Sequence, residues 1–147
     1  MRVIRKFTLT LAVLATSIAV LAGTARADSR MFVAYLYGGN EVPGPADPDA
    51  FGIATVVIGG SAGSLCYSII LRAADSATAA HIHSGAAGVA GAILLPLPVT
   101  AGMPTRVAGC VTTTTQIISD IRSHPQDFYV NVHTGTFPNG AARGQLQ

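Results

Sequence analysis

From residue 31 onward the chain is a series of short apolar runs, rich in β-branched and aromatic residues and separated by Gly- and Pro-rich segments. Runs of this kind predict β-strands, and the glycines and prolines between them predict turns and loops. The strands are expected at 31–37, 53–60, 64–71, 77–83, 92–99, 105–111, 127–133 and 142–147. The second and third of these are separated by a short turn, which predicts a hairpin. The prolines within the fifth favour a position at the edge of a sheet.

One segment, 112–125, has helical periodicity instead. One of its faces carries Ile117, Ile118 and Ile121. Thr113, with Gln116 three residues later, fits a capping box at the start of a helix, and Pro125 ends the pattern. Many short strands with one short helix predict an all-β fold, namely an antiparallel Greek-key β-sandwich or barrel. The sequence contains no internal repeat or linker, so a single domain is expected.

The first 27 residues have a different pattern. A basic start is followed by an uncharged apolar run and by the small residues of Ala25-Arg26-Ala27. This order is typical of a secretory signal peptide that is cleaved before Asp28, which leaves 28–147 as the mature domain. The alternative is a retained membrane anchor, but the apolar run is shorter than the roughly 20 residues that a spanning helix needs. A periplasmic or secreted protein without a membrane anchor is therefore expected.

Removal of the signal peptide changes the charge of the protein. Without Arg2, Arg5, Lys6 and Arg26, the chain keeps 5 basic and 7 acidic residues, a net charge of −2, and no lysine. A domain without a basic patch has no electrostatic reason to bind nucleic acid. Two cysteines remain, Cys66 and Cys110. In an exported protein an even count predicts a disulfide, with two free buried thiols as the alternative.

Three of the four histidines lie in two strand motifs. In "AAHIH", alternation places His81 and His83 on one face of the strand and the isoleucine between them on the other. In "YVNVH", it places Tyr129, Asn131 and His133 together, opposite an apolar face. The apolar faces must line the core. All three histidines are therefore expected on the outer side of the sheet.

Histidines two residues apart on a strand stand about 6.5–7 Å apart at Cα, so their imidazoles can converge on one ion. A third imidazole from a neighbouring strand would complete a ligand set, but spacing does not decide whether the two strands are neighbours. The alternative is a set of exposed histidines on a hydrated face. Imidazoles without thiolate suit Cu(II) or Zn(II), and the usual affinity order favours copper over zinc. His124, next to Pro125, is expected to be a solvated loop residue.

Four motifs resemble those of the CHRD family, a domain named after chordin and common in exported bacterial proteins. They are N-E-V-P, A-H-I-H-x-G-x-x-G, Y-V-N-V-H-T and R-G-Q-L, in this order over nearly all of 28–147. The chain departs from the pattern at Gly44, where a second proline is common. It also has Ala141 and Ala142 where an acidic residue and isoleucine are usual, which affects only contacts near Arg143.

The layout is also similar to that of copper/zinc superoxide dismutase, in which copper histidines lie on the outer face of a Greek-key barrel. This resemblance implies that His81, His83 and His133 are copper ligands and that Arg143 lies near the open side. The histidine-rich zinc loop of that family has no counterpart here, so the bridging histidine and the zinc site are missing. Asn131, Arg143 and Glu41 are expected to support the histidines; Glu41 either bonds its own turn or pairs with Arg143.

These features favour an exported metal-binding module that uses a three-histidine site, for copper rather than zinc. The alternative is a non-catalytic protein-interaction module with an unknown protein partner, as chordin's binding of growth factors suggests. In that case His81, His83, Asn131 and Thr134 would form a structural network that ties the sheet to the glycine-rich loop. A copper-only superoxide dismutase is least favoured, because the zinc loop and a lysine-rich steering surface are both missing. An enzymatic role is therefore less favoured than a binding role.

Overall fold

The computed structural model describes residues 28–59, 63–73, 75–100 and 106–147. The expected signal peptide, residues 1–27, lies outside the described residues. The strands are β1 (Arg30–Tyr37), β2 (Phe51–Ile58), β3 (Ser64–Arg72), β4 (Ala77–Ser84), β5 (Ile93–Leu97), β6 (Arg106–Thr112), β7 (Phe128–Thr134) and β8 (Ala142–Gln145). The helix α1 spans Thr115–Ser123, and short 3-10 turns span Gly38–Asn40 and Pro125–Asp127. Each strand lies within two residues of its predicted start.

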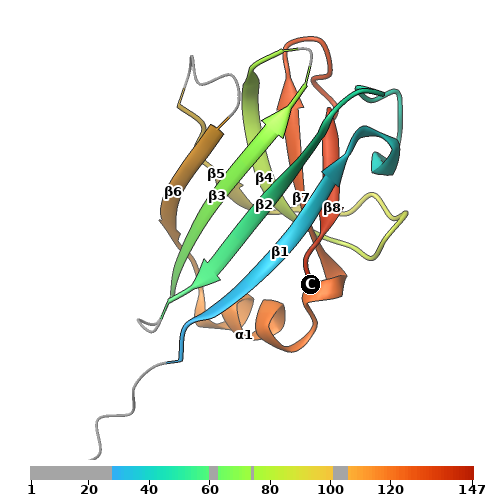
Figure 1. Cartoon of the computed structure of the whole chain (residues 1–147). Coiled ribbons are helices and arrows are strands. Elements are labelled where there is room, and N and C mark those ends of the chain that lie inside the picture. The colour runs from blue at the N-terminus through green and yellow to red at the C-terminus, as the bar shows by residue number, and fades with distance from the viewer. Residues whose placement is uncertain (1–27, 60–62, 74, 101–105) are drawn as a thin grey trace, which may run out of the picture.

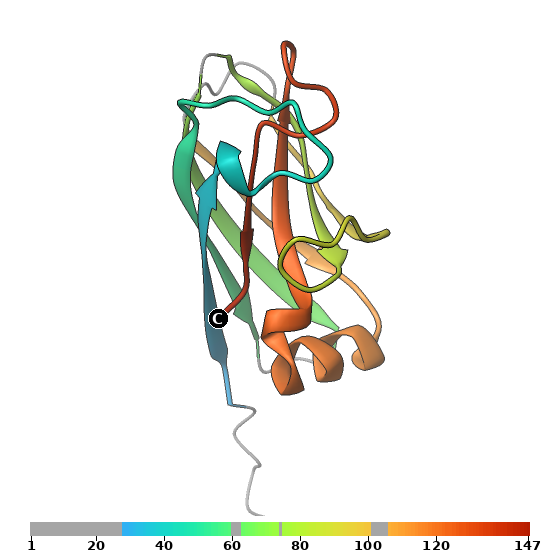
Figure 2. The same cartoon turned by 90° about the vertical axis from the view of Figure 1, so that its right-hand side faces the viewer.

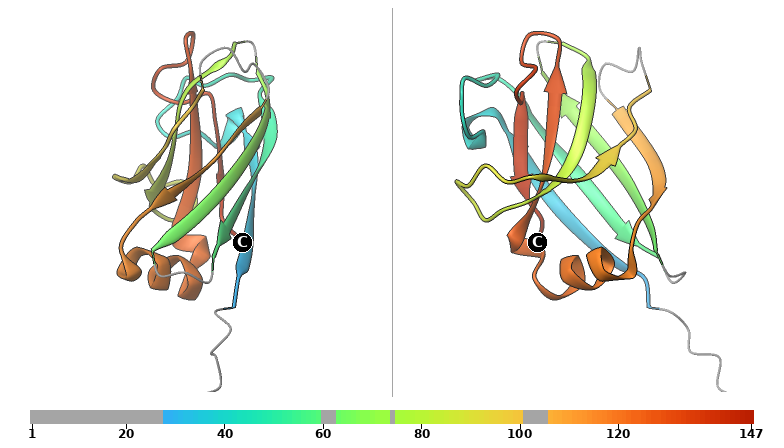
Figure 3. Two further views of the ribbon diagram at one scale, coloured as in Figure 1. Left: turned by 90° about the vertical axis from the view of Figure 1, so that its left-hand side faces the viewer. Right: turned by 180° about the vertical axis from the view of Figure 1, so that it is seen from behind.

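All the strands pair antiparallel in one sheet, in the order β5-β4-β7-β8-β1-β2-β3-β6. The sheet folds over on itself, so that β1, β2, β3 and β6 face β4, β5, β7 and β8 in a nearly closed barrel (Figures 1 and 3). β3 pairs with β6 and β4 pairs with β7, which are crossovers of the Greek-key type. The predicted all-β antiparallel fold, the β2–β3 hairpin and the edge position of β5 are confirmed.

Two sets of contacts join the layers. At the β8–β1 corner, Val33 and Gln147 exchange two backbone hydrogen bonds of 3.0 and 2.9 Å. β8 passes so close to β1 here that a Cβ on Gly144 would lie 2.1 Å from the carbonyl oxygen of Tyr35. The glycine of the R-G-Q motif is therefore required by packing. On the opposite side, the Tyr67 hydroxyl of β3 donates a 2.5 Å hydrogen bond to the Pro98 carbonyl beyond β5.

Apolar side chains fill the space between the layers, as the alternating pattern predicts. Leu36, Val56, Ile69, Ile82, Val130 and Val132 are among those with at most 1% of their surface exposed. The outer side of β3 and β6 carries the cysteines, where Cys66 lies directly opposite Cys110. Their sulfurs are 2.06 Å apart, so the predicted disulfide is confirmed. The disulfide thus links β3 and β6, two strands that are already neighbours in the sheet.

The helix α1 covers one end of the barrel (Figure 2), where Ile121 is fully buried. Its cap differs from the prediction by one residue. The Thr114 hydroxyl, not that of Thr113, accepts a hydrogen bond from the Ile117 amide. Gln116 therefore lies in the first turn, where its side-chain amide donates to Asp120 rather than closing a capping box. Among the described residues, none of the helices has both the length and the apolar character that crossing a bilayer requires.

The two faces of β4 should respond differently to truncation in the metal-free protein. Ile82 is fully buried, so Ile82→Ala should lower the free energy of unfolding by about 2–5 kcal/mol. His81 lies on the opposite face and is only partly buried, so His81→Ala should cost clearly less. Urea denaturation of the two variants beside the parent protein provides the measurement. A larger loss for His81→Ala would contradict the assignment of faces.

Candidate metal centre

The pairing of β4 with β7 decides where the histidines lie. His81 is directly opposite Asn131, while His133 is opposite Ala79, two positions away along β4. His133 is therefore a diagonal neighbour of His81, a position from which long side chains reach each other. The sequence left open whether these two strands are neighbours. The structure shows that they are, and that all three histidines lie on the face away from the core.

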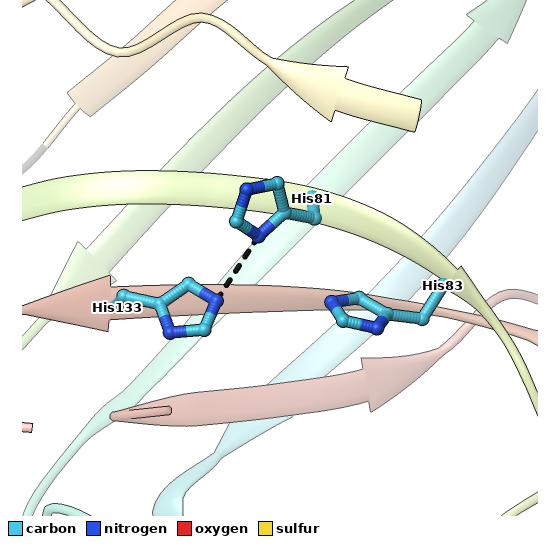
Figure 4. Close-up of side chains that lie close together, drawn as sticks. All are labelled: His81, His83 and His133. Carbon is cyan, nitrogen blue, oxygen red and sulfur yellow. Dashed lines mark hydrogen bonds between the residues drawn. The ribbon is translucent and has the colours of Figure 1, made fainter. Parts of the chain in front are cut away.

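The three imidazoles converge at one point above β4 and β7 (Figure 4). Each offers one nitrogen, and these nitrogens all lie within 4.8 Å of one another. His81 Nδ1 and His133 Nε2 are 3.0 Å apart and share a hydrogen bond. The centroid of the His81 ring lies 5.0 Å from that of the His133 ring and 5.6 Å from that of the His83 ring. The three side chains therefore form one cluster rather than three separate surface groups.

Backbone carbonyls fix the protonation of two of these rings. His83 Nδ1 lies 3.0 Å from the Gly91 carbonyl oxygen, and His133 Nδ1 lies 2.9 Å from that of Pro138. A carbonyl can only accept, so both Nδ1 atoms must donate. In the neutral rings the Nε2 atoms therefore keep free lone pairs that can bind a metal. His133 Nε2 cannot then donate to His81, so His81 Nδ1 carries the hydrogen that the two rings share.

His83 is the most constrained of the three. Its side chain is 9% exposed, and its Nε2 is buried without a hydrogen-bond partner among the described residues. One face of the ring stacks on Tyr129, with centroids 4.7 Å apart and an interplanar angle of 10°. The Arg143 guanidinium covers the Tyr129 ring at 3.6 Å. A buried nitrogen lone pair without a partner costs about 1–3 kcal/mol, which a bound metal would remove.

The three histidines lie on the outer face of β4 and β7, as predicted. This face is more buried than the alternating pattern implies. The glycine-rich loop 85–92 packs against it. Arg143 donates to the Val89 and Ala86 carbonyls, and the Tyr129 hydroxyl accepts from the Gly91 amide. A Cβ at Gly91 would lie 1.4 Å from the Ser84 carbonyl oxygen, so this loop position admits only glycine. The loop thus adds a second buried layer outside the sheet.

Burial also keeps the imidazoles neutral. It is the largest cause that lowers the pKa of each of the three histidines below the ordinary value of 6.5. Their mutual repulsion lowers the pKa of His81 and His83 further. The hydrogen bonds to the Gly91 and Pro138 carbonyls act in the opposite direction on His83 and His133. Neutral rings are the form that binds metal, so the cluster is ready to do so at neutral pH.

The three expected supporting residues lie beside the cluster. Asn131 stands opposite His81 in β4 and opposite Arg143 in β8. Its side-chain amide donates to the Glu41 carboxylate. Burial raises the pKa of Glu41 to about 7, although the charge of Arg143 and the Asn131 hydrogen bond both lower it. Glu41 is thus bound to Asn131, which neither of the two sequence-based alternatives for this residue included.

His124 does not belong to the cluster. It is exposed and ends α1, where its backbone amide bonds the Asp120 carbonyl. Two contributors to the site were not foreseen from sequence: the stacking of Tyr129 and the carbonyl groups of Gly91 and Pro138. Tyr129 was visible as a polar-face neighbour of His133, but a backbone carbonyl gives no sequence signal.

The donor set suits a metal ion in kind and in geometry. Metal–imidazole bonds of about 2.0–2.1 Å require nitrogens that are roughly 3–4 Å apart, close to the separations here. Among the described residues, the group contains no carboxylate or thiolate. Three neutral imidazoles leave at least one coordination position free. The arrangement defines a candidate mononuclear metal site on the outside of a Greek-key barrel.

Comparison with known families agrees with the motifs. The CHRD domain family model matches residues 32–146, and the protein therefore belongs to the CHRD domain family. The match contains both histidine motifs and the terminal R-G-Q segment. Neither the curated proteins nor the solved structures include a significant match. The likeness to superoxide dismutase therefore remains a resemblance of motif layout.

The lowered histidine pKa values predict a pH dependence of stability. In the metal-free protein the folded state binds fewer protons than the unfolded state once the pH falls below about 6.5, so stability should fall from there toward pH 5. The raised pKa of Glu41 has the opposite effect between about 7 and 4.5. The measurement is therefore best made in a Glu41→Gln background, by denaturant unfolding at pH 8, 6.5 and 5.

The control for this experiment is the exposed histidine. Adding His124→Ala should leave the pH profile unchanged, whereas adding His83→Ala should make it less steep between pH 6.5 and 5, because one of the three buried histidines is removed. An equally steep profile after His83→Ala would show that the cluster is not the source of the pH dependence.

Proposed function

We propose that this CHRD domain binds one Cu(II) ion through His81 Nδ1, His83 Nε2 and His133 Nε2. The observation that carries the proposal is the unpartnered Nε2 of His83, buried beside two further imidazole nitrogens. Carbonyl contacts already hold His83 and His133 in the tautomer that a metal ligand needs. Little rearrangement is required, because the metal takes the place of the hydrogen that His81 and His133 share.

Copper is favoured over zinc by the chemistry of the donors. Cu(II) lies above Zn(II) in the general affinity order for nitrogen ligands. The group supplies three protein ligands, which argues against a closed structural zinc site with four. An oxidising compartment fits both the disulfide and the sequence of the first 27 residues. We therefore propose a location in the periplasm or outside the cell.

Copper titration of residues 28–147 by calorimetry tests this proposal. One Cu(II) should bind per chain at pH 7.5, and electron paramagnetic resonance should report nitrogen ligands. His81→Ala, His83→Ala and His133→Ala should each weaken binding by more than the roughly 10–100-fold typical of losing an outer-shell partner. His124→Ala should bind copper like the parent protein. Absence of saturable binding of copper and zinc at neutral pH would contradict the proposal.

The hydrogen that His81 and His133 share leads to a second prediction, which concerns the tautomer of His81 and does not depend on affinity. In the metal-free protein at pH 8, all three rings should be neutral with the hydrogen on Nδ1. Diamagnetic Zn(II), bound in place of Cu(II), should move the hydrogen of His81 to Nε2 and leave it on Nδ1 in His83 and His133. Side-chain ¹⁵N shifts of labelled histidine would report the change. An unchanged His81 tautomer in the zinc-saturated protein would exclude Nδ1 as its ligand atom.

A non-catalytic interaction module is the second candidate function. Two observations favour it: hydrogen bonds from Arg143 and to the Tyr129 hydroxyl hold the 85–92 loop against the sheet, and the outer face of β1 and β2 exposes Tyr35, Tyr37 and Phe51 by 50–52% each. A well-folded protein that fails to bind metal in the titration above would support this candidate. Superoxide dismutase activity is the least favoured, and the copper-loaded protein is expected to have little or none.

A further inference from the structure

A second site is indicated by the surroundings of Arg143. Its side chain is 2% exposed, and a guanidinium remains charged at any physiological pH. The contacts that the structure shows for this group all go to uncharged partners: the carbonyls of Val89 and Ala86 and the ring of Tyr129. A buried charge is costly unless it is paired with an opposite charge.

Glu41 only partly compensates for this charge. Its hydrogen bond goes to Asn131, and its pKa is raised to about 7 in spite of the nearby guanidinium. Burial thus disfavours the ionised form of this carboxyl group, and its hydrogen bond is to Asn131 rather than to the guanidinium. The positive charge of Arg143 remains available to an anion from outside the chain.

A cavity of about 300 Å³ is lined in part by Arg143 and lies between the segment 39–42 and the tip of the glycine-rich loop. This volume is at the lower end of the range for small-molecule sites. Arg143 is the one charged residue among those that line it, which are Gly39, Asn40, Val42, Ala87, Gly88, Arg143, Gly144 and Gln145. None of the three clustered histidines is among them. The cavity is thus separate from the candidate metal centre.

We propose that this cavity binds a small organic monocarboxylate, with its carboxylate on Arg143 and its apolar body between Val42 and Ala87. The guanidinium has five N–H donors, of which the Val89 and Ala86 carbonyls use only part. Its planar fork matches the geometry of a carboxylate. A single cation balances a single negative charge, whereas a phosphate dianion would leave one charge unpaired beside Arg143. This site does not depend on metal binding.

The test uses metal-free residues 28–147 with butyrate, and with butyramide and inorganic phosphate as matched probes at equal ionic strength. Butyrate should shift the backbone amide signals of Ala87, Gly88 and Gly144 in a saturable manner, and both other probes should bind at least about tenfold more weakly. Equal shifts by butyramide would overturn the role of charge. Tighter binding of phosphate would overturn the assignment of the ligand class.

Gly39→Leu is the key variant, because Gly39 lines the cavity and a Cβ at this position meets no other atom within 4 Å. It should weaken butyrate binding at least about tenfold while leaving copper binding unchanged. His81→Ala should do the reverse, so the two sites can fail independently. Unaltered butyrate binding in Gly39→Leu, or shifts confined to the three histidines, would overturn the proposal.

Discussion

The antiparallel register between β4 and β7 is the constraint on which the candidate site depends. It places His133 diagonally across from His81 and brings both rings beside His83. Because side chains alternate with a period of two, a slip by one residue would turn His133 into the core and expose the valines beside it. Burial of Ile82, Val130 and Val132 on the other face therefore fixes the position of the histidines. Core packing and metal chemistry are coupled through one strand pair.

The candidate site also depends on the loops that pack against the outer face of the sheet. The Gly91 and Pro138 carbonyls orient two of the rings, and both belong to loops rather than strands. Arg143 and Tyr129 hold the first of these loops by contacts with its backbone. The glycines after the H-I-H motif and the terminal R-G-Q segment thus act on the same site from distant positions in the sequence. This gives a physical reason why the two motifs occur together in this chain.

Alternation and turn residues were enough to predict the strands, the faces of the histidines and the class of fold, because these depend on neighbours in sequence. The pairing of β4 with β7 could not be predicted, because β5, β6 and α1 intervene in the chain. Burial of His83 depends on loop 85–92 folding back, which alternation does not describe. The shift of the helix cap from Thr113 to Thr114 reflects a run of four threonines, any of which can cap a helix.

The central claim is that these three imidazoles converge on one metal ion through specified nitrogen atoms. Crystals of residues 28–147 soaked in Cu(II), with anomalous diffraction recorded at the copper edge, test it most directly. The account predicts one strong peak about 2 Å from His81 Nδ1, His83 Nε2 and His133 Nε2. A peak at exposed His124 with none at the cluster, or a cluster that keeps its His81–His133 hydrogen bond in saturating copper, would contradict it.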